Sequence, residues 1–108
     1  MKTEVANLHH EYPTHVREQV ATKVQHLARF FDGTVSVRAV LERQHDVHRV
    51  DLVANVRRGV VLVVDARADS IQAALDEAVE RMGRVLKRHK SKIKQEGRRR
   101  RARSRISD

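Results

Sequence analysis

Several residue types that often determine a protein's chemistry are missing or scarce in this sequence. Its 108 residues include no cysteine and no tryptophan, one proline, one tyrosine and two phenylalanines. Without cysteine, disulfide bonds, thiol catalysis and thiolate metal sites are excluded. No apolar run is long enough for a membrane span or a secretory signal. We therefore expect a single cytoplasmic domain with a core of valine, leucine, isoleucine and alanine.

Positive charge is distributed very unevenly along the chain. Residues 1–83 contain 11 lysines and arginines against 12 acidic residues, whereas residues 84–108 contain 12 against two. Essentially all of the formal net charge of +9 therefore lies in the last quarter of the chain. Such an excess on one segment is typical of a protein that binds a polyanion.

Hydrophobic periodicity predicts two helices. The first covers residues 15–31, with Thr14 as its N-cap and Gly33 ending it in a left-handed conformation. The second covers residues 70–94, begins at the cap Asp69-Ser70 and ends at Glu96-Gly97. The segment after it has almost nothing to bury, so we expect a folded domain over residues 1–96 and a flexible, disordered arginine-rich tail over residues 97–108.

Between these helices the apolar period changes to two, which is typical of strands. The predicted strands cover residues 34–42, 50–57 and 60–68, with a weaker candidate over residues 1–8. Residues 43–48 are expected to form a loop and residues 57–59 a tight turn in which Gly59 provides a positive φ. The order β-α-β-β-β-α predicts an α+β fold, with one four-stranded sheet and both helices packed on one face. The polar alternate residues of the strands are then expected to face water on the other side.

Cations follow the helical periodicity on both predicted helices. The residues expected to contact a polyanion are Lys23, His26, Arg29, Arg81, Arg84, Lys87, Arg88, Lys90, Lys92 and Lys94. From Arg81 to Lys94 no acidic residue occurs, although a solvated helix face normally carries both signs. A bound polyanion explains this run better than solvation does, whereas Lys23 alone fits a solvated face. Because aromatic residues are scarce, recognition of single strands by base stacking is disfavoured. The expected polyanion is therefore structured RNA or a duplex.

Catalytic and metal-binding patterns are weak. Among seven histidines, His45 and His48 form one loosely spaced pair without an evident third ligand, so we expect no metal. The sequence lacks a G-x-S-x-G motif and a P-loop, and its carboxylates are not paired. We therefore expect neither an enzyme, nor a cofactor, nor a small-molecule substrate.

Two segments resemble a known family. The segment DSIQAALDEAVERMGRVLKRHKSKIK, with its core Ala73-Ala74-Leu75-Asp76 and its basic Lys-x-Lys end, resembles the second helix of the ribosome hibernation promoting factor / ribosome-associated inhibitor A family, also called the sigma-54 modulation family. The segment VREQVATKVQHLARFFD is similar to that family's first helix. The resemblance covers residues 1 to about 94. The chain departs from the family pattern at Asn7, where glycine is usual, and at Pro13-Thr14, where the family has Thr-Pro.

The resemblance implies a function without chemistry. Family members bind the small ribosomal subunit between head and body, across the tRNA and mRNA channel at the A and P sites, and block translation by occlusion. By position, their RNA-facing residues match the helix cations named above from Lys23 to Lys92. Long members add a C-terminal dimerisation domain, and this chain ends too early to include it, so we expect either a short form or the first domain of a long form. We also expect the protein to be monomeric off the ribosome.

Two other hypotheses remain beside this one. A general structured-RNA or duplex-binding module would bind ribosomes, duplex RNA and DNA alike, and a metal-dependent enzyme would use the histidines. The tail residues Arg98, Arg99, Arg100, Arg101 and Arg103 are expected to add phosphate contacts, and the alternative is a merely solvated tail.

Overall fold

The computed structural model describes residues 1–8 and 12–106 of the chain, with side chains up to Arg98. Its elements are β1 (Lys2–Asn7), α1 (Thr14–Gln25), the 3-10 helix η2 (His26–Phe30), β2 (Thr34–Gln44), β3 (Val47–Val56), the 3-10 turn η3 (Arg57–Gly59), β4 (Val60–Ala68) and α2 (Ile71–Ile106). The predicted order β-α-β-β-β-α is therefore confirmed, including the weak first strand.

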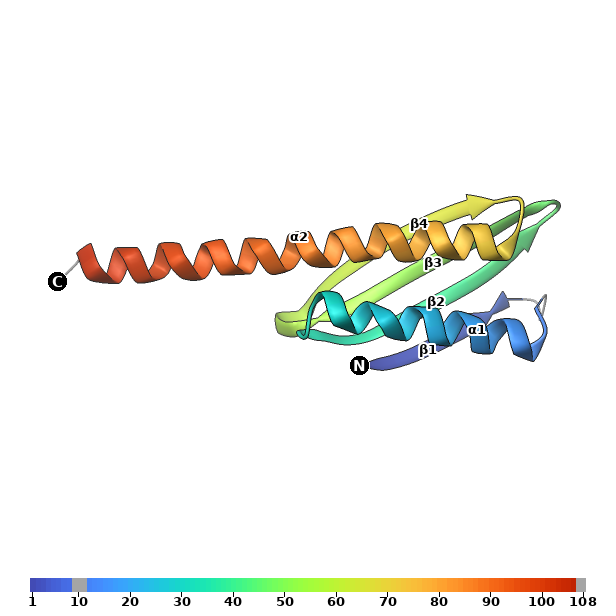
Figure 1. Ribbon diagram of the computed structural model, residues 1–108, viewed down its shortest axis with the longest axis horizontal. Coiled ribbons are helices and arrows are strands. Elements are labelled where there is room, and N and C mark those ends of the chain that lie inside the picture. Colours follow the sequence, from blue (N-terminus) through green and yellow to red (C-terminus); the bar gives the residue numbers. More distant parts are fainter. Residues whose placement is uncertain (9–11, 107–108) are drawn as a thin grey trace.

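The four strands form one mixed sheet in the order β1-β2-β3-β4. Strand β1 pairs with β2 in parallel, and the other two pairings are antiparallel. A parallel neighbour requires a crossover connection, and α1 provides it. Both helices lie side by side on the same face of the sheet (Figure 1), as predicted.

The core lies between the sheet and the two helices. Inward-facing strand residues alternate as the sequence predicts, with Val37, Ala39 and Leu41 on β2 and Val50, Leu52 and Ala54 on β3 all fully buried. The helices cover them with Val20, Val24, Leu27, Ala74, Leu75, Ala78, Met82 and Leu86. Since burial of apolar surface provides the main driving force for folding, these residues fix how α1 and α2 sit on the sheet.

The other face of the sheet is open to solvent. The strand alternation places charged residues of both signs on it, among them Glu4, Arg38, Arg49, Asp51 and Asp65. The prediction of a polar outer face is confirmed at these positions. Three valines also lie on this face, at positions 53, 61 and 63, and Val63 is 62% exposed.

Two connections differ from their predictions. The predicted loop over residues 43–48 is wrong in length, because β2 and β3 continue as a ladder to the pair Gln44–Val47 and leave only a two-residue turn, with His45 at φ 56°. In the second turn Gly59 has the predicted positive φ, at 73°, and Arg58 shares it at 69°. The last pair of the ladder, Val56–Val60, leaves the three residues Arg57–Gly59 in this turn, so two of its three residues have a positive φ.

The ends of the first helix also differ from their predictions. The helix begins at Thr14 with Pro13 as its N-cap, so Thr14 is a helical residue and not the cap. Gly33 does not adopt the predicted left-handed conformation. Among the glycines of the described residues, Gly59 is the one with a positive φ. A Cβ at Gly33 would lie 2.3 Å from the Cζ of Phe31, so the absent side chain makes room for the Phe31 ring.

Helix α2 starts as predicted but does not end as predicted. The backbone amide of Ala73 donates a hydrogen bond to the Oγ of Ser70 at 3.1 Å, which confirms the cap. The helix then continues through Gly97 to Ile106, so the predicted end near residue 94 is wrong. One glycine costs a helix only about 1 kcal/mol, and the flanking Lys, Arg, Gln and Glu are good helix formers. The division of the chain at residue 96 and the flexibility of residues 97–108 stay predictions.

The second half of α2 projects beyond the sheet (Figure 1). Among the side chains described up to Arg98, Leu86 is the last fully buried one of the helix, and Ile93 is already 37% exposed. The molecule is accordingly elongated, with principal extents of 62 × 22 × 19 Å.

Candidate nucleic-acid interface

The ten cations predicted on the helices all lie on the helix layer, and eight of them fall into two groups with different surroundings. Lys23 lies on α1, His26 and Arg29 lie on η2, and the other seven lie on α2. Each is at least partly exposed. The difference between the groups is whether a carboxylate holds the cation.

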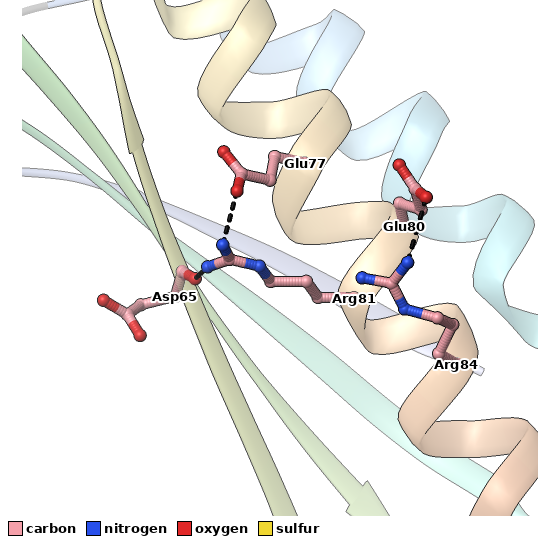
Figure 2. Close-up of polar contacts among 5 residues, drawn as sticks. All are labelled: Asp65, Glu77, Glu80, Arg81 and Arg84. Carbon is pink, nitrogen blue, oxygen red and sulfur yellow. Dashed lines mark hydrogen bonds and ion pairs between the residues drawn. The ribbon is translucent and has the colours of Figure 1, made fainter.

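Three of these cations are held by carboxylates. Arg84 donates to Glu80 at 3.1 Å, and Arg81 pairs with Glu77 (Figure 2). Lys23 pairs with Asp76 across the boundary between α1 and α2. We call Lys23, Arg81 and Arg84 the paired cations.

Arg81 has a second contact. Its Nη1 donates to the backbone carbonyl of Asp65 at 2.6 Å, so the side chain ties α2 to β4, the edge strand of the sheet (Figure 2). An edge carbonyl that accepts a hydrogen bond is less open to pairing with a further strand. Arg81 therefore has a structural task besides any contact with a polyanion.

Two cations of the acid-free run have carboxylate partners after all, so the run is not unneutralised throughout as its sequence suggested. The run from Arg81 to Lys94 contains no acid, but Glu77 and Glu80 precede two of its cations by four residues. Residues four apart face each other on a helix. The first two cations of the run therefore have partners that lie just outside it. Exposed pairs of this kind contribute only about 0.2–1 kcal/mol to stability.

The second group begins one turn later on α2. Its members are exposed and take part in no ion pair among the side chains that the structure describes, and they are Lys87, Arg88, Lys90, Lys92, Lys94 and Arg98. We call them the arm cations. They lie on the part of α2 that leaves the sheet, so the unneutralised positive charge is concentrated where the helix projects. Arg99, Arg100, Arg101 and Arg103 occupy helical backbone positions farther along, and their side chains lie outside the described part.

A groove between η2 and α2 joins the two groups. It has a volume of about 420 Å³ and is lined by Arg29, Phe30, Asp76, Val79, Glu80, Gly83, Arg84 and Lys87. Phe30 was missed as a functional candidate. Its neighbour Phe31 is buried in the core, which directs Phe30 toward the boundary between the helices. The signal was present in the sequence, since adjacent residues of a helical turn face different sides.

The histidines have varied surroundings. His48 Nδ1 lies 2.6 Å from the Tyr12 hydroxyl, so this histidine joins the start of α1 to the β2–β3 hairpin. His89 packs edge-on against Phe31 with ring centroids 5.5 Å apart. Over residues 1–8 and 12–98, no three histidine, aspartate or glutamate side chains gather closely enough to hold a metal ion. His9 and His10 lie outside the described residues.

The open face of the sheet has a different electrostatic character. Arg49 donates to Asp51 at 2.9 Å and lies 3.8 Å from Asp65. The hydrogen bond and the charge of Asp51 raise the pKa of the Arg49 guanidinium. Charges of both signs are interleaved here, so this face offers a phosphate chain no continuous positive surface.

Taken together, the fold and its charges define an α+β domain that presents positive charge from its helices and not from its sheet. In the described residues no helix is both long and apolar enough to cross a membrane. Residues 4–94 match the family model of the sigma 54 modulation protein / S30EA ribosomal protein. The chain therefore belongs to the sigma 54 modulation protein / S30EA ribosomal protein family, which confirms the resemblance drawn from its two helices.

Curated relatives agree with this assignment. The chain is 32% identical over 80 residues to the ribosome hibernation promoting factor of Salmonella typhimurium, covering 74% of this chain and 83% of that protein. It is 30% identical over 95 residues to the ribosome hibernation promotion factor of Rhizobium meliloti, covering 87% of this chain. The matched part is half the length of the Rhizobium protein.

Solved structures share the fold. The N-terminal domain of Protein Y from Thermus thermophilus superposes with a TM-score of 0.72 at 24% identity, over 82% of this chain and 99% of that one. A ribosomal subunit interface protein from Coxiella burnetii superposes with a TM-score of 0.73 at 14% identity, over 84% and 99%. At these identities the likeness concerns the arrangement of the sheet and its two helices.

Proposed function

We propose that this protein is a ribosome hibernation factor that binds ribosomal RNA of the small subunit through its helix layer and inhibits translation without chemistry. The observation that carries the proposal is the set of arm cations, which lie unneutralised on the projecting part of α2. Membership of a family whose curated relatives carry the name of ribosome hibernation factors supports it.

The shape of α2 fits a narrow site lined by RNA. A helix rises about 1.5 Å per residue, so the backbone from Lys87 to Ile106 extends roughly 30 Å, and the arm cations lie along its first part. Each cation that meets a phosphate releases a condensed counterion, which makes the binding strong at low salt and steeply salt-dependent. The proposed site is the tRNA and mRNA channel at the A and P sites, where a bound helix layer excludes tRNA by occupying its space.

The proposed mechanism also bears on the ligand, the location and the oligomeric state of the protein. Binding needs no cofactor and no small-molecule substrate, because the ligand is the phosphate backbone and the shape of folded RNA. A ribosomal partner places the action of the protein in the cytoplasm. We also propose that the protein is monomeric off the ribosome, since like-charged arms repel each other.

The test is binding to purified small subunits, followed by sedimentation at several salt concentrations with and without tRNA. We expect the protein to sediment with the subunits at low salt, to be released as salt rises, and to be displaced by tRNA in the P site. Protein that stays unbound at low salt would refute the proposal.

A second candidate is a general module for structured RNA or duplex nucleic acid. The observation in its favour is that the arm cations lie on one extended helix, which can follow any phosphate backbone. Competition separates the two functions. A general module is displaced from subunits equally well by duplex RNA and by DNA, whereas a ribosome-specific factor retains its preference for subunits.

A further inference from the structure

Phe30 holds two cations from two different elements. The guanidinium carbon of Arg29 lies 4.7 Å from the centroid of the Phe30 ring, and the Nζ of Lys87 lies 4.8 Å from it. Both distances are within the roughly 6 Å over which a cation is attracted to an aromatic face. The ring thus joins η2 to α2 at the point where the arm cations begin.

This way of holding a cation differs chemically from an ion pair. Glu77, Glu80 and Asp76 hold the paired cations and also cancel their charge. An aromatic ring attracts a cation through its quadrupole and carries no charge of its own, so the cation keeps its full charge. Among the described side chains, neither Arg29 nor Lys87 has a carboxylate partner. Phe30 therefore orients two cations and leaves both available to an anion.

The ring itself is fixed in place by a close approach to α2. A Cβ at Gly83 would lie 3.1 Å from Cε2 and 3.4 Å from Cδ2 of Phe30, so the edge of the ring lies against the helix at a position without a side chain. Phe30 also packs against the core as a half-buried residue. A ring with its edge on the helix and two cations over it has little free face on which a base could stack.

We propose that Arg29, Phe30 and Lys87 form a preorganised site for one backbone phosphate of RNA, in which Phe30 is a positioning residue. This inference rests on the proposed RNA binding and adds the class of ligand and the residue that prepares the site. A guanidinium offers two parallel donors and an ammonium a third, which together match the oxygens of a phosphate. Preorganisation lowers the entropy that two long side chains lose on binding.

The first experiment uses the free protein and tripolyphosphate as the probe, followed by NMR on the side chains of Arg29 and Lys87. In the wild type the ring current should shift the terminal methylene protons of Lys87 upfield, and Phe30→Leu should remove that shift. Phe30→Leu should weaken tripolyphosphate binding roughly fivefold. Phe30→Tyr keeps the aromatic face and should bind as the wild type does. Thermal melts of both variants establish that each is folded.

The second experiment is a double-mutant cycle on small subunits. If Phe30 acts through the two cations, Phe30→Leu should weaken binding in the wild type and have no further effect in an Arg29→Gln, Lys87→Gln background. An unchanged effect of Phe30→Leu in that background would mean that the ring contacts RNA itself, which overturns the inference.

The outcomes also separate this inference from the proposed function. Wild-type protein that fails to bind subunits refutes the proposed function, while the tripolyphosphate titration still tests the site. Wild-type binding that Phe30→Leu leaves unchanged in both experiments refutes the inference alone.

Discussion

Helix α2 contains two stretches with the same residue types and opposite electrostatic roles. In the stretch 77–84, Arg81 and Arg84 each face a glutamate four residues earlier, and the sheet lies beneath them. In the stretch 87–98 the arm cations have no such partners among the described side chains, and the helix leaves the sheet. The role of an arginine or lysine on this helix therefore depends on whether a carboxylate lies four residues before it, and not on the type of cation.

This contrast explains how one helix serves both folding and recognition. The first stretch anchors α2, since Ala78 and Met82 are fully buried and Arg81 is tied to the edge strand. The second stretch contributes little burial and leaves its charge open. Mutual repulsion among like charges disfavours the free arm, and a polyanion relieves that repulsion when it binds.

The largest expected effect comes from removing charge on the unpaired stretch. Lys87→Gln, Lys90→Gln and Lys92→Gln together should weaken binding to small subunits roughly a hundredfold, at about 1 kcal/mol per lost phosphate contact. The slope of log affinity against log salt should become shallower by roughly two to three. Salt-dependent sedimentation measures both quantities.

The matched control removes a cation together with its carboxylate. Glu80→Gln with Arg84→Gln leaves the net charge unchanged, and we expect binding within about twofold of the wild type. If this control weakened binding as much as the triple variant, the distinction between paired and arm cations would fail.

A smaller effect is expected from deleting residues 97–108. Fewer phosphates are neutralised, so affinity should fall roughly tenfold and the salt dependence should become shallower. Displacement by tRNA should be unchanged, because the contacts of α1, η2 and the remaining part of α2 persist. Complete loss of the preference for subunits over duplex RNA would instead place specificity in the tail.

Removing the carboxylate partners of Arg81 and Arg84 should leave the stretch 77–84 as unneutralised as the stretch 87–98. Glu77→Gln with Glu80→Gln frees Arg81 and Arg84, and we expect binding to become roughly threefold tighter with a salt slope steeper by up to about two. The cost in stability should stay below about 1 kcal/mol per pair. Asp46→Asn with Glu42→Gln, at the β2–β3 hairpin, removes the same two negative charges and is the control for a general change in net charge. Equal tightening by this control would show that pairing on α2 is irrelevant.

Much of the fold could be predicted from the sequence because periodicity reflects burial directly. Val37, Ala39 and Leu41 alternate along a strand with one buried face, and Ala74, Ala78 and Met82 recur at helical spacing. The end of α2 could not be predicted in this way. A glycine such as Gly97 can end a helix or lie within one. Which of the two occurs depends on the helix propensity of the flanking residues, which is high here.

The candidate site was predictable in its residues but not in its organisation. Charge counts located the basic part of the chain, yet the partner of Lys23 is Asp76, which lies 53 positions away in the sequence. The two cations at Phe30 likewise come from elements that only the fold brings together. Contacts between elements depend on the packing of α1, η2 and α2, and a pattern within one segment does not contain that information.

The smallest expected effect concerns the continuity of α2 at Gly97. Alanine is favoured over glycine in a helix interior by about 1 kcal/mol. Apart from the adjoining residues and the helix's own backbone, no atom of the described side chains lies within 4 Å of a Cβ added at this position, so Gly97→Ala should raise the helical content seen by circular dichroism. If the arm cations bind RNA as part of one continuous helix, this variant should bind subunits about twofold more tightly, because less ordering remains to be done on binding. Higher helicity with weaker binding would mean that the arm must bend at Gly97 to reach its phosphates, and the two stretches of α2 would then be separate segments joined by a hinge.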